Sequence, residues 1–209
     1  MVSTPAPAQA ATGRRRGPYA STASRRAQIV RAALASFAEH GYERASLRDI
    51  AARAGLTHAA LLRHFSGKDE LLLTALAQHE SDEEALAERI AQSKLPPGRI
   101  LSAVLADEFA APDYQRNWMA LAVAATSPDH PAHDFFVGRS HRLRSRLTGT
   151  TLATAGGSAT FSADEKVTLI LAMMDGLRIQ SLLDPGEQLL QPLEKFMNLI
   201  TTPSAETEE

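Results

Sequence analysis

Apolar residues recur along this chain with the period of an α-helix, and no segment shows the apolar–polar alternation of a half-buried strand. The first helical segment spans residues 22–40, where Ile29, Ala33 and Phe37 are four residues apart and form one apolar stripe. Gly41 follows directly, and glycine is the residue at which helices commonly end. The pattern therefore predicts an all-α protein whose first helix ends at Gly41.

Two short helices are predicted next, joined by a tight turn at Gly55. Ser46 is a favourable N-cap for the first of them, and Thr57 is a favourable N-cap for the second, which we expect to end near His64. The inward positions of the pair are Leu47, Ile50, Ala51, Ala54, Leu56, Leu61 and Phe65. Two short helices with a glycine in the turn between them are typical of a helix-turn-helix that reads DNA.

The remainder of the chain is predicted to be helical, with proline and glycine marking the breaks. A long helix is expected to open at the box-like sequence Ser66-Gly67-Lys68-Asp69 and to end before Pro96-Pro97, and Ser162 is expected to cap a later helix. Five further helices are expected at 98–110, 113–126, 132–155, 163–183 and 188–201. The total is about nine helices.

The helical pattern also suggests four regions. Residues 1–20 are rich in Ala, Pro, Ser and Thr and carry Arg14-Arg15-Arg16, which indicates a disordered basic arm. Residues 21–67 form the helix-turn-helix domain, residues 68–202 form a helical body, and residues 203–209 form an acidic tail. The sequence leaves open whether the arm contacts DNA in the minor groove or only keeps the protein soluble.

Charge is distributed unevenly over these regions. The formal net charge of the whole chain is −2, which by itself argues against a nucleic-acid-binding protein. Residues 1–66, however, hold 10 arginines and 3 acidic residues and carry +7, while the remaining 12 basic and 21 acidic residues give −9. A basic head on an acidic body favours binding of a polyanion at the head alone.

Several functional classes find no support in the sequence. The chain has 0 cysteines, which excludes disulfides and thiolate chemistry and fits a reducing cytoplasm. No apolar run approaches the roughly 20 residues that cross a membrane, and no signal peptide is evident. Glycine-rich phosphate loops and the motifs of serine hydrolases and zinc proteases are missing. We therefore expect a cytoplasmic protein that is not an enzyme and has no cofactor or metal.

The segment "SLRDIAARAGLTHAALLRHFSGKDELL", residues 46–72, has a recognisable order: polar cap, helix, Gly-apolar turn, second helix, Phe, then Lys opening a third helix. With the helix before it, it resembles the DNA-binding domain of the TetR family over residues 24–72, about a quarter of the chain. The resemblance implies a homodimeric, all-helical transcriptional regulator that binds a double-stranded DNA operator. It implies further that the variable C-terminal body binds a small-molecule effector.

The same resemblance implies which residues contact DNA. They are Arg48, Thr57, His58, Ala59, Ala60, Leu62, Arg63, His64 and Lys68. Leu62 stands where the family commonly has Tyr, and Ala60 stands where it commonly has a hydroxyl residue, so both positions lose a hydrogen-bonding group. Base recognition would then depend on Arg48, His58 and Arg63, while His64 and Lys68 match phosphate contacts. The orphan N–H groups at the start of the long helix would assist Lys68.

In the body, the resemblance implies that the last two long helices pair with those of a second subunit. Both have broad apolar faces, part of which must complete the core of the monomer. Methionine and aromatic residues suit an adaptable apolar effector pocket. The candidates are Phe109, Trp118, Met119, Phe135, Phe136, Met173 and Met174. The sequence identifies neither the effector nor the operator.

Two charged groups in the body have alternative interpretations. His130, His133 and Asp134 lie close in sequence, but we favour helix capping by Asp134 or a neighbour over a metal site. Arg139, Arg142 and Arg146 share one helix face and are expected either to be solvated or to pair with acidic residues of the long helix. These acidic residues are Asp82, Glu83, Glu84 and Glu88.

The leading hypothesis is a repressor that leaves a pseudo-palindromic operator when an effector binds. A transcriptional activator of the same fold is equally compatible with the sequence. A non-specific architectural DNA-binding protein is disfavoured, because such proteins spread positive charge over most of their surface, whereas this body is acidic.

Overall fold

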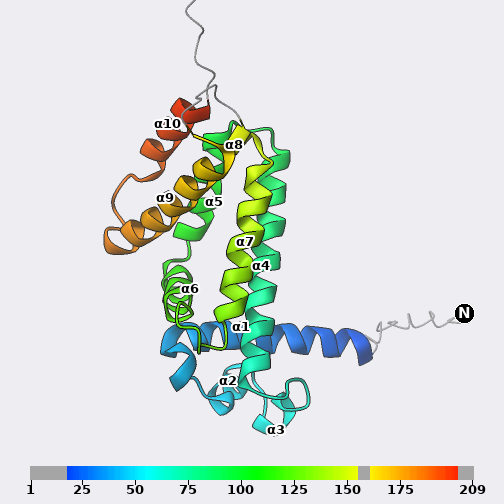
Figure 1. Ribbon diagram of the computed structural model, residues 1–209. Helices are drawn as coiled ribbons and strands as arrows, with labels where there is room; N and C mark the ends of the chain where they lie inside the picture. The colour runs from blue at the N-terminus through cyan, green and yellow to red at the C-terminus, as the bar shows by residue number, and fades with distance from the viewer. Residues whose placement is uncertain (1–17, 155–160, 202–209) are drawn as a thin grey trace, which may run out of the picture.

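The computed structural model describes residues 18–154 and 161–201 of the chain. These residues form ten α-helices and no strand (Figure 1), so the predicted all-α fold is confirmed. The helices are α1 (Pro18–Arg44), α2 (Leu47–Arg53), α3 (His58–Leu61), α4 (Lys68–Gln92), α5 (Pro97–Phe109), α6 (Pro112–Ala124), α7 (His133–Thr148), α8 (Thr151–Thr154), α9 (Ala163–Leu183) and α10 (Leu190–Thr201). Arg14-Arg15-Arg16 and the acidic tail lie outside the described residues.

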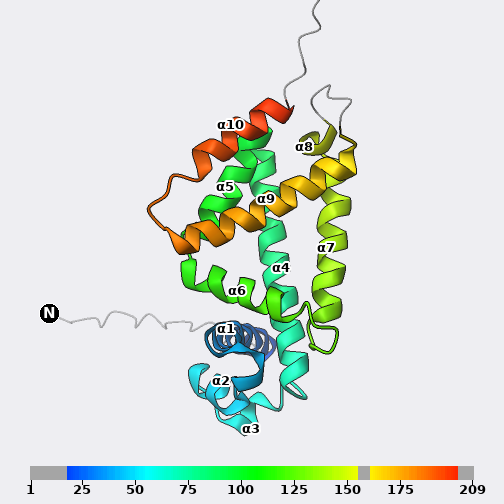
Figure 2. The same ribbon diagram turned by 60° about the vertical axis from the view of Figure 1, so that its left-hand side comes forward.

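The helices divide into a head and a body joined by α4 (Figures 1 and 2). The head, α1–α3, lies at one end of the molecule, and the body, α5–α10, lies at the other. Helix α4 starts in the head and runs alongside α7 through most of the body. None of the helices described is both long enough and apolar enough to span a membrane.

Local sequence signals account for the shape of the head. Gly41 interrupts the long first helix with φ 75° and ψ 165°, and Gly55 has φ 66° in the turn between α2 and α3. Both angles lie in a region that side chains with a Cβ rarely adopt, which explains why glycine occupies these positions. The Ser46 hydroxyl accepts from the Arg48 N–H at 3.2 Å, and the Thr57 hydroxyl accepts from the Ala60 N–H at 3.2 Å. Both predicted N-caps are therefore confirmed.

Some helix ends differ from the expectation. Helix α3 has only four residues and continues as tight turns to His64, and the helix predicted at 132–155 is divided at Gly149 into α7 and α8. At the start of α4, the carboxylate of Glu70, rather than that of Asp69, accepts from the Ser66 N–H at 2.7 Å. The split at Gly149 explains why the described part has ten helices instead of about nine.

Two apolar cores stabilise the molecule. The first fills the head and extends into the body, because Leu121, Ala125 and Ala132 pack with the head residues Ile29 and Phe37. The second core joins α5, α9 and α10, and its buried residues are Leu101, Leu105, Leu152, Ile170, Met174, Leu193 and Met197. Full burial of each large side chain contributes roughly 1.5–3 kcal/mol. Because residues of α1 and α6 share the first core, the orientation of α1 is coupled to that of α6.

Candidate functional site

The outer surface of the head is formed by α3 and the start of α2. Of the residues expected to contact DNA, Arg48, Thr57, Ala59, Leu62 and Arg63 are exposed, while His58, Ala60 and His64 are half-buried. The inward positions predicted from the sequence are buried or packed against the first core. Because α3 has small residues at its leading edge and a buried opposite side, it has the slim profile that enters a major groove.

Positive charge on this surface is available for a ligand. Within the described residues, the guanidinium groups of Arg48 and Arg63 form no hydrogen bond or ion pair. Arg53, by contrast, donates to Glu39 at 2.5 Å, although it lies on the same short helix as Arg48. An exposed arginine without an intramolecular acceptor keeps all its donors for a base edge or a phosphate. Arg48 and Arg63 are thus the strongest hydrogen-bond donors on the outer surface of the head.

Arg26 of α1 holds the end of the recognition segment, a role that the sequence analysis missed. Its Nη1 donates to the His64 carbonyl oxygen at 2.8 Å, and its guanidinium lies 4.1 Å from the centroid of the Phe65 ring. It also pairs with Glu70 at 3.7 Å. These contacts join three helices, because residues 64–65 follow α3 and Glu70 lies in α4. The partners are 38 or more residues away in sequence, and no local pattern indicates such a contact.

Lys68 has a different environment from the one expected. Its ammonium group donates to the Glu43 carbonyl oxygen at 3.0 Å and lies 4.4 Å from the centroid of the Tyr42 ring. The Tyr42 hydroxyl donates to the Asp69 carboxylate. Burial, followed by the nearby Asp69 carboxylate, raises the pKa of Tyr42 to about 12. Lys68 therefore joins the end of α1 to the start of α4, and its contact with phosphate remains a prediction.

Tyr42 also connects the head to the body. Its ring lies 6.0 Å from that of Phe37 and meets the edge of the His130 ring at 5.5 Å. His130 lies in the loop between α6 and α7, and its Nδ1 accepts from the Ala132 N–H at 3.2 Å. Burial lowers the pKa of His130, which favours the neutral ring that this hydrogen bond needs. Tyr42 is thus the meeting point of α1, α4 and this loop.

The histidines of this loop have structural partners. His133 Nδ1 donates to the Ala125 carbonyl oxygen at 2.9 Å, which ties the start of α7 to the end of α6. No cluster suited to a metal ion occurs among the described residues. The expectation that Asp134 caps the helix is wrong, since α7 has no side-chain cap and Asp134 lies within its first turn. The ring of His130 satisfies a nearby backbone donor instead.

Comparison with known proteins identifies the head. Residues 29–75 match the family model described as "Bacterial regulatory proteins, tetR family". Over these residues the chain is similar to the DNA-binding domain of the TetR family. A segment of 131 residues is 35% identical to an HTH-type transcriptional repressor of Mycobacterium tuberculosis and covers 62% of this chain and 64% of that protein. A segment of 69 residues is 42% identical to the HTH-type transcriptional activator FasR of Mycolicibacterium smegmatis, covering 33% and 32% of the two chains.

The likeness extends beyond the head at the level of structure. A transcriptional regulator from Rhodococcus sp. Rha1 superimposes with a TM-score of 0.68 and 26% identity, covering 84% of this chain and 95% of that one. The chain thus spans about two thirds of one curated relative by sequence and one third of the other. The head is thus similar in sequence to the DNA-binding domains of transcriptional regulators, and the described helices have the fold of such a regulator.

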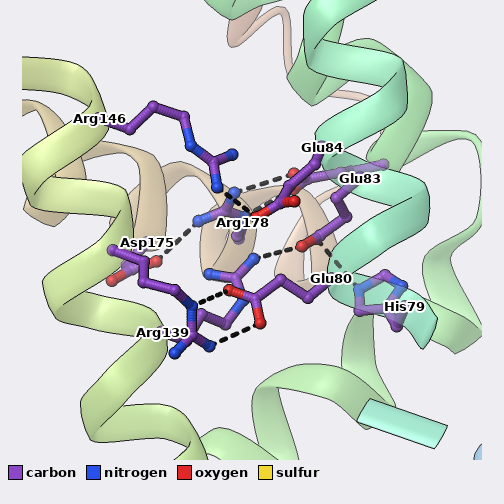
Figure 3. Close-up of polar contacts among 10 residues, drawn as sticks. His79, Glu80, Glu83, Glu84, Arg139, Arg146, Asp175 and Arg178 are labelled. Atoms are coloured by element: carbon purple, nitrogen blue, oxygen red, sulfur yellow. Dashed lines mark hydrogen bonds and ion pairs between the residues drawn. The ribbon is translucent and has the colours of Figure 1, made fainter. Parts of the chain in front are cut away.

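In the body, paired charges join α4 to α7 (Figure 3). Arg142 forms two hydrogen bonds with Glu80, at 3.0 and 2.6 Å, and Arg139 and Arg146 pair with Glu83 and Glu84. The expected pairing of the α7 arginines with acidic residues of α4 is confirmed, although Glu80 takes part instead of Asp82 or Glu88. The two helices run in the same direction (Figure 1), and the first two pairs cross, since Glu80 reaches Arg142 while Glu83 reaches back to Arg139.

The expected pocket residues do not form one lining. Phe109, Met173 and Met174 belong to the second core, whereas Trp118, Phe135 and Phe136 pack against the first. Met119 is half-buried and packs in neither. A shallow cavity of about 430 Å³ between α7 and α9 has a different lining, with His141, Arg144 and Asp164 among its residues.

Rings and charges gather where α4, α6 and α7 meet. His79 lies between Tyr114 and Trp118, with ring centroids 4.7 and 4.1 Å away, and Arg139 lies 5.2 Å from the Trp118 ring. His79 also pairs with Glu83 at 3.0 Å. Burial alone would raise the pKa of the Glu83 carboxyl. The hydrogen bond from His79 and the positive charge of Arg139 outweigh burial and lower this pKa to about 2. We call these five residues the body cluster.

Proposed function

We propose that this protein is a homodimeric transcriptional repressor that binds a pseudo-palindromic operator and is released from it by a small-molecule effector. The observation that carries the proposal is the exposed, unpaired donor pair Arg48 and Arg63 on the outer surface of a helix-turn-helix. On this proposal, both arginines and His58 contact base edges in the major groove. Thr57, Ala59, Ala60 and Leu62 line the groove, and His64 and Lys68 contact phosphates.

Selection of binding sites from a random DNA pool tests this proposal directly. The wild-type protein should enrich one palindrome, and either Arg48→Ala or Arg63→Ala should lower affinity for it by about 1–3 kcal/mol and relax one base position in each half-site. Arg89→Ala is a matched control, because Arg89 is also exposed and unpaired within the described residues but lies on the distal part of α4. An unchanged selected sequence in both head variants would refute the proposed recognition surface.

The proposed dimer interface follows from an unpaired apolar stripe on α9. The stripe is repeated every three and four residues and comprises Leu169, Ala172, Gly176, Ile179 and Leu183. Leu183 is 80% exposed, and Leu199 on the neighbouring α10 is 77% exposed. A Cβ at Gly176 would meet nothing within 4 Å in the monomer, so a helix of a second subunit can approach there. The spacing is that of helices packed side by side.

A substitution on this stripe tests the dimer. Ile179→Glu places a charge in the centre of the proposed interface and should shift the protein from dimer to monomer in light scattering at micromolar concentration. Val123→Glu is the matched control, because Val123 is 65% exposed on α6 and lies outside the stripe. A wild-type protein that scatters as a monomer would contradict the proposal, as would a dimer that withstands Ile179→Glu.

Repression is favoured over activation as the mode of regulation. The match to a relative named a repressor spans 131 residues, whereas the match to the activator spans only 69 residues. The site of action would be the cytoplasm, where bacterial operators lie. Transcription in vitro from a promoter that contains the selected palindrome separates the modes, since a repressor lowers transcript yield and an activator raises it.

A further inference from the structure

Leu62 is a large apolar residue on the outer surface of the head. It follows α3 directly and is 43% exposed, whereas its neighbour Leu61 is fully buried. Among the side chains described in residues 24–67, it is the only large apolar one that is exposed. A single exposed leucine is common on protein surfaces, so its position is more informative than its exposure. Helix α3 lies at the end of the head that is farthest from the body (Figures 1 and 2), where the proposed operator binds.

The residues beside Leu62 on this surface are Ala59 and Arg63. The backbone is helical from His58 to Leu62, since the Leu62 N–H donates to the His58 carbonyl oxygen at 3.1 Å and Leu62 has φ −65° and ψ −11°. Residues three and four apart are neighbours on a helix, so Ala59 lies next to both Leu62 and Arg63. Ala59 and Arg63 are exposed as well. The outward side of this segment therefore presents a small residue between a large apolar side chain and a guanidinium group.

The apolar part of this surface cannot recognise a base by hydrogen bonding. The Thr57 hydroxyl accepts from the Ala60 N–H at 3.2 Å and is held at the start of α3, while Ala59 and Leu62 have no polar side-chain atom. In the major groove, the apolar group that a base presents is the C5-methyl group of thymine. Ala59 is small and leaves space for such a methyl group beside the Leu62 side chain.

We propose that Leu62 and Ala59 determine specificity by contacting the C5-methyl group of one thymine in each operator half-site, beside the guanine that Arg63 contacts. This inference rests on the proposed function, because it assigns a further base contact to the same surface. Arginine most often reads guanine, through O6 and N7. Leu62 and Arg63 both adjoin Ala59, so the base pairs that they reach are neighbours. The half-site should therefore contain a thymine next to a guanine.

The methyl group makes a contribution that can be measured separately from hydrogen bonding. Uracil differs from thymine only in lacking this methyl group, and it keeps every donor and acceptor of the base. Burial of one methyl-sized group changes affinity about fourfold, and a dimer that binds two half-sites buries two of them. Loss of both methyl groups should thus lower affinity about fifteenfold.

Substituted duplexes of the selected palindrome test this contact with the wild-type protein, by fluorescence anisotropy. Uracil in place of the thymine next to guanine in both half-sites should give the fifteenfold loss, whereas uracil in the flanking sequence should change nothing. A C·G pair at the same two positions should also bind weakly. 5-Methylcytosine there should bind about fifteenfold more tightly than cytosine, because its methyl group occupies the place of the thymine methyl.

A protein variant assigns the contact to Leu62. Leu62→Ala should bind the thymine and uracil duplexes with affinities within about twofold of each other, while its preference for the adjacent guanine remains. Leu73→Ala is the matched control and should keep the fifteenfold ratio, because Leu73 is 39% exposed but lies on α4. Both residues are exposed, and circular dichroism would verify that both variants are folded.

Three results would overturn the proposal. They are a selected half-site without thymine, equal affinity for the thymine and uracil duplexes at every half-site position, and a Leu62→Ala variant that keeps the wild-type ratio. In each of these cases the protein still binds one palindrome, so the proposed function stands. Failure to select any palindrome would instead refute the proposed function, and with it any sequence-specific contact by Leu62.

Discussion

At the scale of single residues, Arg26 is the side chain that fixes the recognition segment in place. It combines a hydrogen bond to the His64 carbonyl oxygen, a contact with the Phe65 ring and an ion pair with Glu70. Each contact alone is modest, but all three hold the same end of α3 against α1 and α4. Since DNA recognition depends on the position of α3 to within a fraction of an ångström, Arg26 should affect specificity without contacting a base.

We therefore predict that Arg26→Gln lowers affinity for the selected palindrome about tenfold and affinity for random DNA much less. The slope of log affinity against log salt should stay at the wild-type value, because no phosphate contact is lost. Fluorescence anisotropy over a salt series measures both quantities. Arg25→Gln is the control, as Arg25 is exposed and, within the part of the chain that the structure describes, donates only to Gln28. A lower slope for Arg26→Gln would show that Arg26 contacts phosphate directly.

For Lys68 we predict the opposite of the Arg26 result, namely a changed salt slope and an unchanged preference for the palindrome. Its ammonium group has three donors, and the Glu43 carbonyl oxygen takes one, so donors remain for a phosphate at the start of α4. Lys68→Ala should weaken binding of palindrome and random DNA equally and reduce the salt slope by roughly one per subunit. Lys94→Ala, at the far end of α4, serves as the control. If the slopes of wild type and Lys68→Ala coincide, Lys68 acts only as the link between α1 and α4.

Residues such as these show where sequence reasoning ends. Ser46, Thr57 and Gly55 were predicted correctly because a cap or a tight turn depends on neighbours within three residues. The contacts of Arg26 and Lys68 bring together residues 38 and 25 positions apart, and any surface arginine or lysine has the same local pattern. The exposed surface of the helix-turn-helix was predictable, whereas the side chains that hold it in place were not.

At the scale of helices, the contact between α4 and α7 depends on charge. Glu83 has a side chain 25% exposed and pairs with both Arg139 and His79. Its pKa in the folded protein is about 2, well below the ordinary value of 4.5, so the folded state favours the carboxylate. The stabilisation from this group is therefore complete above pH 4.5 and is lost as the pH falls towards 2.

Acid unfolding of a Glu83→Gln variant tests this dependence. Between about pH 4.5 and pH 2 the unfolded chain binds a proton at Glu83 that the folded protein does not bind, so the free energy of unfolding of the wild type should fall steeply over this range. The variant has no carboxylate to protonate and should show a shallower fall, together with lower stability at pH 7. Urea unfolding at several pH values measures both. Glu88→Gln is the control, since Glu88 is exposed and unpaired within the described residues.

Helix boundaries were predictable where a breaker residue defines them. Pro96-Pro97 ends the α4 segment, and Ser162 forms a capping box with Glu165 at the start of α9. Gly149 was not recognised as a break, because the apolar spacing continues across it into α8. The partners of the α7 arginines were predicted only as a group, because periodicity indicates which side of a helix faces its neighbour but not the register between two helices.

At the scale of the whole molecule, the division into head and body is weaker than the sequence suggests. The first core includes Leu71, Leu72 and Leu76 of α4 as well as Leu121 of α6, so it crosses the boundary predicted at residue 68. Charge still separates the two regions, with +7 on residues 1–66 and −9 on the rest. Because the shared core connects head and body, the interface of the proposed dimer would set the distance between its two heads.

This connection predicts a strict requirement for operator spacing. A dimer with fixed heads should bind the selected palindrome far more tightly than a duplex with a single half-site, because the second head binds without a further loss of translational freedom. Inserting about five base pairs between the half-sites rotates one of them by half a helical turn, and affinity should drop to that of the single half-site. Anisotropy titrations with the three duplexes measure this. A non-specific architectural protein would bind all three alike, so equal affinities would favour that class over the repressor.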